Sequence, residues 1–130
     1  MISSLILATS MLVGVLASAT HALRICNGAS SAKVALVYSY GVPYANKFLR
    51  CGTTGYGYNH IKSRWLADPN FSAYIRSTMQ YGNTTQQGTA TVFQCYSVAI
   101  NCRRVSFRVV YENSNYSDGN DKGIITAYRN

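Results

Sequence analysis

Acidic residues are scarce in this chain, in which four Asp and Glu stand against twelve Lys and Arg and the formal net charge is +8 over 130 residues. Four scattered carboxylates and two histidines are a poor source of ligands for a divalent metal. We therefore expect any catalysis to proceed without a metal or another cofactor. The positive excess favours a polyanionic partner, namely nucleic acid, an anionic membrane or an acidic glycan, although it also serves solubility.

Long hydrophobic runs are also few. Residues 5–16 form such a run and are followed by small residues at 17–22, which is the pattern of a secretory signal peptide. The run is shorter than the roughly 18 apolar residues that a membrane-spanning helix needs. We expect residues 1–22 to be a signal peptide, cleaved after Ala22 or three residues earlier, and residues 23–130 to be one basic domain of a secreted protein, extracellular or periplasmic.

Closely spaced Cys-x-x-Cys pairs are absent, which argues against a zinc site. Cys26, Cys51, Cys95 and Cys102 all lie in the expected mature domain. An even number of cysteines in an exported chain indicates disulfides, and four cysteines allow three pairings. We favour Cys26–Cys51, which would fix the N-terminal segment, and Cys95–Cys102, which would clip a hairpin.

The first half of the mature domain has helical patterning. Apolar spacing interrupted by turn residues predicts two short helical stretches within residues 30–49, and a glycine-rich loop follows at 51–58. A helix capped by Asn59 is expected over residues 60–66, and a second one over 71–79 that Gly82 ends. A polar loop then continues through residues 87–88.

The second half changes to the patterning of strands. Residues 89–100 and 103–112 are rich in Val, Thr, Tyr and Phe and predict two antiparallel strands, and residues 124–129 predict a last strand. Helices first and strands afterwards indicate an α+β fold, with N-terminal helices packed on a C-terminal antiparallel β-sheet of three to five strands. Alternation places Arg104, Ser106 and Arg108 on one strand face, and Thr126 beside Tyr128 on one face of the last strand.

Histidine is nearly absent, since His60 is the only one that remains after removal of the signal peptide. On a helix, His60 and Arg64 share a face, whereas Lys62 lies off that face. A base beside cations suits phosphodiester cleavage, because imidazole transfers protons near neutral pH and cations neutralise the charge that grows on the phosphorane. A lone histidine is nevertheless more often a surface or packing residue, and the eleven tyrosines suit base stacking or glycan binding equally.

Three segments carry a family resemblance: residues 57–65 (GYNHIKSRW), 71–79 and 122–128 (KGIITAY). They resemble the ribonuclease toxin superfamily that includes barnase, EndoU, the colicins and RelE, in which a histidine at the start of a helix faces a curved antiparallel sheet. The resemblance implies a general base or acid, three phosphate ligands and two residues at the scissile phosphate: His60; Lys62, Arg64 and Arg108; Thr126 and Tyr128.

This chain departs from the superfamily at one position. Many members carry a second histidine in the helix, close to where Trp65 stands here. Without it, the partner acid or base would be Tyr128, Tyr111 or Lys62, or the domain would bind its ligand without cleaving it.

The expected function is that of a secreted, metal-independent endoribonuclease toxin that cleaves RNA by 2′-hydroxyl attack and leaves a 2′,3′-cyclic phosphate. Its producer would then need an immunity protein or inhibitor, which we expect to be acidic. Two alternatives belong to other classes. One is a non-enzymatic cytotoxic or antimicrobial protein that binds membranes or glycans, and the other is an effector that binds a host protein.

Overall fold

The computed structural model describes residues 21–41 and 43–130, so most of the expected signal peptide lies outside the described residues. Residues 21–26 are helical. The named elements that follow are β1 (Val34–Tyr40), β2 (Ala45–Arg50), α2 (Tyr58–Ala67), α3 (Phe71–Tyr81), β3 (Asn83–Gln87), β4 (Ala90–Cys95), a 3-10 turn (Ile100–Cys102), β5 (Phe107–Asn115) and β6 (Asp121–Arg129). The fold is α+β, with helices packed on a C-terminal antiparallel sheet, as the sequence predicts.

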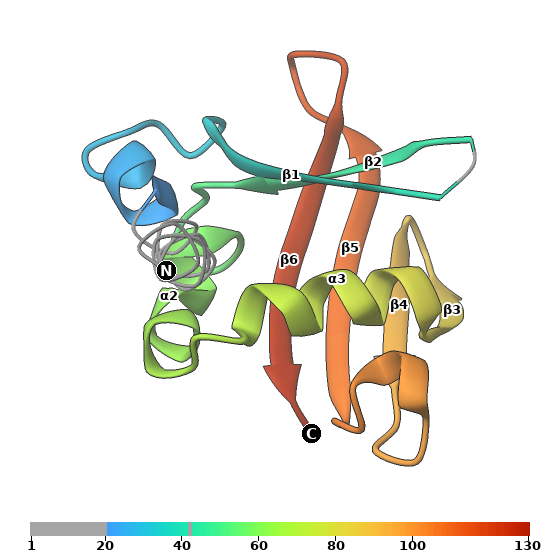
Figure 1. Ribbon diagram of the computed structural model, residues 1–130. Coiled ribbons are helices and arrows are strands. Elements are labelled where there is room, and N and C mark those ends of the chain that lie inside the picture. The colour runs from blue at the N-terminus through green and yellow to red at the C-terminus, as the bar shows by residue number, and fades with distance from the viewer. Residues whose placement is uncertain (1–20, 42) are drawn as a thin grey trace, which may run out of the picture.

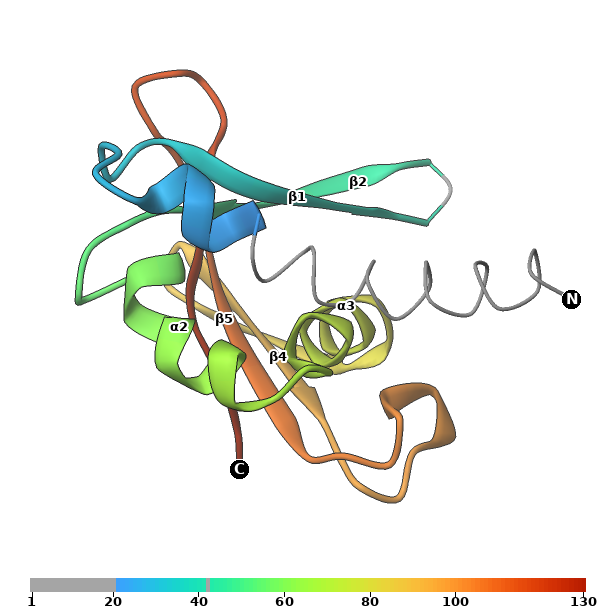
Figure 2. The ribbon, with the colours of Figure 1, turned by 60° about the vertical axis from the view of Figure 1, so that its left-hand side comes forward.

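Four strands form the main sheet in the order β3-β4-β5-β6, and each neighbouring pair is antiparallel. Helix α3 crosses one face of this sheet, α2 lies beside β6, and the β1–β2 hairpin lies across the end of the sheet opposite to the C-terminus (Figure 1). Figure 2 turns the side that bears α2 toward the viewer and shows α3 on one side of the strands.

Helix α3 buries one stripe of side chains against the sheet. Phe71, Ile75 and Met79 recur every four residues and are almost fully buried. They meet the inward side chains of β5, where Phe107 and Val109 alternate with half-buried residues. The ring centroids of Phe71 and Phe107 are 5.1 Å apart in an edge-to-face arrangement. Local periodicity thus placed this helix correctly.

The prediction of two short helices within residues 30–49 is wrong, because this segment is the β1–β2 hairpin. Strand β1 contains a bulge between Val34 and Leu36, which interrupts the alternation by which a strand is recognised. In β2, the consecutive residues Leu49 and Arg50 are both fully buried. The two-residue period was therefore hidden, and the remaining apolar spacing imitated a helix.

The start of α2 also differs from the prediction. The helix begins at Tyr58, with Gly57 as its N-cap residue. The side chain of Asn59 does not cap the helix and instead donates to the carbonyl oxygen of Gly52 at 3.1 Å. Asn59 thereby fixes the glycine-rich loop to the helix.

Two strand assignments need correction. The polar segment Asn83–Gln87, expected to be part of a loop, is strand β3, because backbone pairing with β4 holds it although all its residues are exposed. Residues 96–106 contain the 3-10 turn and no strand, so Arg104 and Ser106 precede β5. These two residues therefore do not share a strand face with Arg108.

A fully buried cation, Arg50, joins the hairpin to the end of the main sheet. Its two Nη atoms donate to the carboxylate of Asp118 at 2.8 and 2.9 Å, and the guanidinium also donates to the carbonyl oxygens of Ala32 and Asp121 at 2.7 and 2.9 Å. A buried charge is tolerated when it is paired and fully hydrogen-bonded. Arg50 is therefore a structural residue and not part of the cationic surface.

The backbones of the hairpin and β6 come into close contact at Gly123. This residue has a φ of +94°, and a Cβ atom there would overlap the carbonyl oxygen of Phe48. Beside this contact, the hydroxyl of Tyr111 accepts a hydrogen bond from the Phe48 amide at 3.0 Å and donates one to Asp121 at 2.9 Å. The backbone crossing and this hydrogen-bonded group fix the hairpin on the sheet.

Both disulfides have the pairing that the sequence favoured. Cys26–Cys51 attaches the 21–26 helix to the residue after β2, and Cys95–Cys102 closes the connection between β4 and β5. Such disulfides form in an oxidising compartment. Within residues 21–41 and 43–130, no helix has the length and apolar content needed to cross a bilayer.

Candidate functional site

The sheet face opposite α3, called the outer face below, carries Arg108. In the cross-strand register, Arg108 lies between Gln94 of β4 and Tyr128 of β6, and the next row along pairs Val110 with Thr126. Side chains directly opposite each other have Cβ atoms about 4.5–5.5 Å apart. The structure therefore brings Arg108, Thr126 and Tyr128 into one cluster.

A bulge in β6 sets which residues face outward. The pairing with β5 shifts between Val110 and Tyr111, so the period of two is interrupted at Ile125. Ile124 and Ala127 are fully buried on the side of α3. Thr126, like Tyr128, remains half-buried on the outer face.

Helix α2 places Arg64 at the free edge of β6. Three buried residues anchor the helix in the core, and Arg64 lies on the flank that adjoins the strand. Its Nη1 lies 3.4 Å from Oγ1 of Thr126 and 3.3 Å from the carbonyl oxygen of Ala127. The guanidinium is 6.0 Å from the ring centre of Tyr128. Arg64 thus links α2 to the outer face and covers part of an exposed strand edge.

His60 precedes Arg64 by one helical turn and lies on the same flank of α2. Its Nδ1 is 2.7 Å from the carbonyl oxygen of Thr54. Because a carbonyl oxygen only accepts, Nδ1 carries the proton in this contact, and Nε2 of the neutral ring has a lone pair that can accept another. The start of the helix is fixed to β6 by a 3.1 Å hydrogen bond from the Gly57 amide to the Ile125 carbonyl. The imidazole is therefore oriented and available as a base.

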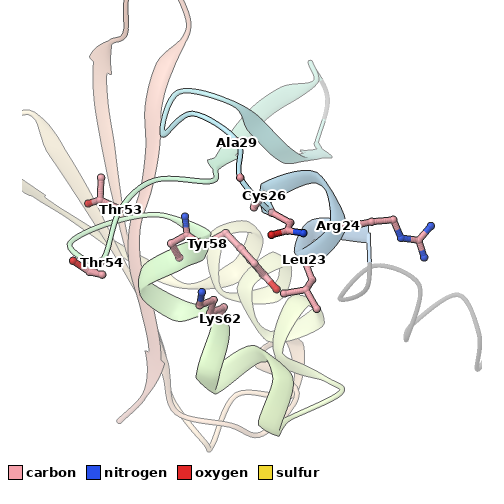
Figure 3. Close-up of a pocket in the computed structure, with 11 residues that line it drawn as sticks. Leu23, Arg24, Cys26, Ala29, Thr53, Thr54, Tyr58 and Lys62 are labelled. Atoms are coloured by element: carbon pink, nitrogen blue, oxygen red, sulfur yellow. The ribbon is translucent and has the colours of Figure 1, made fainter.

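The structure separates Lys62 from the other predicted phosphate ligands. At 3.6 residues per turn, Lys62 lies about 160° around the helix from Arg64. Its side chain lines a cavity of about 850 Å³ between α2, the loop after β2 and the 21–26 helix (Figure 3). Lys62 therefore does not share the outer face with Arg64 and Arg108.

That cavity contains an unsatisfied polar group. Tyr58 is fully buried, its hydroxyl makes no hydrogen bond within the described part of the chain, and burial raises its pKa. Figure 3 shows its ring extending from α2 toward the 21–26 helix. Thr54, whose carbonyl holds His60, also lines the cavity. The loop after β2 thus lies between the cavity and the histidine.

Only one of the three residues considered as an acid or base partner of His60 lies on the outer face. Tyr111 is fully buried on the opposite face, where burial raises the pKa of its hydroxyl well above the ordinary range. Lys62 lines the cavity. Tyr128 remains, half-buried beside Arg108 in the register.

Sequence reasoning missed Glu112. This residue is two positions beyond Val110 on β5, so it lies on the outer face, and it pairs with Gly123 of β6. Its carboxylate accepts a hydrogen bond from the Ser114 amide at 2.9 Å, which lowers its pKa. The other three acids hold Arg or Tyr side chains: Asp68, Asp118 and Asp121. The alternation of β5 could have identified it, because Glu112 follows Arg108 by four residues and therefore lies on the same face of the strand.

No protein-family model, curated protein or solved structure matches this chain. In the part of the chain that the structure describes, no three His, Cys, Asp or Glu side chains gather where they could hold a metal ion. The geometry of the chain's own residues is therefore the basis for inferring its function.

Proposed function

We propose that this protein is a secreted endoribonuclease that binds RNA on the outer face and cleaves it with His60 and without a metal. One arrangement carries the proposal. A histidine with its Nδ1 held by a carbonyl stands one turn from Arg64, and Arg64 contacts Thr126 beside Tyr128 and Arg108. A base, two guanidiniums and two hydroxyls are groups that assist attack by a ribose 2′-hydroxyl on phosphorus.

In this mechanism, Nε2 of His60 takes the proton of the 2′-hydroxyl while the 2′-oxygen forms a bond to phosphorus. Arg64 and Arg108 neutralise the charge on the non-bridging oxygens of the phosphorane. The bond from phosphorus to the 5′-oxygen then breaks, and the hydroxyl of Tyr128 gives its proton to that oxygen. The products are a 2′,3′-cyclic phosphate and a 5′-hydroxyl, and His60 returns its proton to Tyr128 through solvent.

The proposal is tested by incubating the oxidised mature protein with tRNA and total RNA in EDTA and resolving the products on a denaturing gel. His60→Asn is the informative variant, because its amide can still donate to the Thr54 carbonyl but cannot act as a base. We expect it to lose about 10²- to 10⁴-fold in rate. Arg108→Gln should lose about 10²- to 10³-fold, whereas Lys33→Gln, which removes an exposed cation just before β1, should keep the activity. Intact RNA with folded wild-type protein would contradict the proposal.

A toxin role accompanies this proposal. Two disulfides favour folding after export, and the reduced chain in the cytosol of the producer would be less stable. We expect the producer to hold an acidic inhibitor that competes with RNA for Arg64 and Arg108. An Arg108→Gln variant should then bind that inhibitor more weakly, and the affinity for the wild type should fall as salt is raised.

A further inference from the structure

The loop of residues 96–101, between Cys95 and Cys102, exposes an unusual concentration of apolar side chains. Tyr96, Val98 and Ile100 are 53%, 85% and 73% exposed. Single exposed hydrophobic residues are ordinary on a protein surface, whereas a contiguous apolar group marks an interaction site. The loop projects at the end of the sheet that is opposite to the β1–β2 hairpin (Figure 1).

This exposure belongs to an ordered loop. The Cys95–Cys102 disulfide closes it over a sequence separation of seven. Within it, the Ala99 amide donates to the Tyr96 carbonyl at 3.0 Å, and the Cys102 amide donates to the Ala99 carbonyl at 3.2 Å. The Ser97 amide donates a hydrogen bond to the hydroxyl of Ser106 at 3.2 Å. The loop is therefore rigid and presents its apolar side chains in a fixed arrangement, which lowers the entropic cost of binding.

Two exposed arginines stand directly after this loop. Arg103 and Arg104 have φ angles of 57° and 56°, a left-handed conformation that few residues other than glycine adopt. Strained backbone of this kind is found preferentially where function requires it. Nε of Arg103 is fixed by the Ser77 hydroxyl of α3 at 3.2 Å. No acidic residue occurs between positions 96 and 104, so the cationic character of the segment is unopposed locally.

We infer that the 96–101 loop with Arg103 and Arg104 inserts into the surface of an anionic phospholipid bilayer. An aromatic ring and two aliphatic side chains on a projecting loop can be buried at the boundary between headgroups and acyl chains. The neighbouring guanidiniums can bind the headgroup phosphates. The net charge of +8 adds attraction over a longer range. This site uses none of the residues assigned to RNA cleavage, so it does not depend on that proposal.

The test is co-sedimentation of the oxidised mature protein with vesicles of phosphatidylcholine alone and with added phosphatidylserine. We expect binding to the anionic vesicles and a loss of at least about tenfold in Val98→Ser/Ile100→Ser. A matched control is Tyr44→Ser/Leu66→Ser, which removes two side chains that are 79% and 55% exposed elsewhere on the surface. This variant should bind the anionic vesicles as the wild type does. Arg103→Gln/Arg104→Gln should weaken binding to anionic vesicles more than binding to neutral ones.

A second measurement reports insertion itself. Val98→Trp places an indole on the loop, and its fluorescence should shift to the blue and be quenched by lipids brominated in their acyl chains. Trp65 is almost fully buried and supplies a constant background. The inference is overturned if wild-type protein does not sediment with anionic vesicles. It is equally overturned if binding is unchanged in Val98→Ser/Ile100→Ser, or if the added indole stays accessible to water, since charge alone would then explain the attraction.

Discussion

Replacing Arg50 by methionine should lower the free energy of unfolding of this domain by more than the substitution of an exposed residue. Arg50→Met keeps an unbranched side chain of similar length but leaves Asp118 and the carbonyl oxygens of Ala32 and Asp121 without the donors that now lie 2.7–2.9 Å away. Because the side chain of Asp118 is 44% exposed, water can solvate its carboxylate once the guanidinium is gone, and loss of the ion pair costs less than the roughly 3–5 kcal/mol of a fully buried pair. Each acceptor left without a partner costs about 1–3 kcal/mol, and this cost overlaps with the first. We therefore expect a loss of about 4 kcal/mol, most of it from the two backbone carbonyl oxygens left without a donor.

That loss is large for a domain of about a hundred residues, whose total free energy of unfolding is about 5–15 kcal/mol. Since 1 kcal/mol corresponds to about 4–8 °C at this size, the midpoint of thermal unfolding should fall by about 15–30 °C. Far-UV circular dichroism with both disulfides intact measures it, with Lys33→Met as a control at an exposed cation. A loss below about 1 kcal/mol for Arg50→Met would contradict this expectation, because the hydrogen bonds of a side chain that is 0% exposed would then contribute almost nothing to stability.

Three other perturbations test the fold. Gly123→Ala should cost about 3 kcal/mol or more in urea unfolding, because the new Cβ meets the Phe48 carbonyl at a positive φ; a cost below that of an ordinary surface substitution would contradict the close crossing. Replacing Cys26 and Cys51 together by serine should cost about 3–4 kcal/mol, which is more than loss of the shorter second disulfide loop. The ion pair lowers the pKa of Asp118 from its ordinary 3.8, so the stability that this carboxylate contributes is present above that pH and is lost as the pH falls through the lowered value. Unfolding curves between pH 5 and pH 2 should therefore show less acid sensitivity for Asp118→Asn than for wild type.

Local patterns predicted the parts of the fold that local contacts determine. Helix α3 was predicted by the recurrence of Phe71, Ile75 and Met79 every four residues, and β5 was predicted by the alternation of residues around Val109. The favoured disulfide pairing, chosen because one bridge could fix the N-terminal segment and the other could clip a hairpin, is confirmed. The β1–β2 hairpin could not be recognised, because a bulge and a buried arginine interrupt its alternation. The role of Arg50 depends on Asp118, which lies 68 residues away in the sequence.

The candidate site was predictable to a similar extent. Helical spacing placed His60 and Arg64 on one flank of the helix. The pairing of Arg108 with Tyr128 is set by the cross-strand register, which no local pattern in the sequence predicted. The contact of His60 with the Thr54 carbonyl could not be predicted, because a backbone atom of a glycine-rich loop has no signature in the sequence. Lys62 was assigned to the site by resemblance alone, and its position on the helix places it at the cavity instead.

Mass spectrometry of the products from a short RNA treated in EDTA would show whether this protein cleaves RNA by 2′-hydroxyl attack. A matched strand in which every ribose carries a 2′-O-methyl group is the substrate control, and His60→Asn is the protein control. We expect a 2′,3′-cyclic phosphate and a 5′-hydroxyl from RNA, no cleavage of the methylated strand, and a rate reduced about 10²- to 10⁴-fold in the variant. Intact RNA, cleavage of the methylated strand, or full activity of His60→Asn would contradict this mechanism.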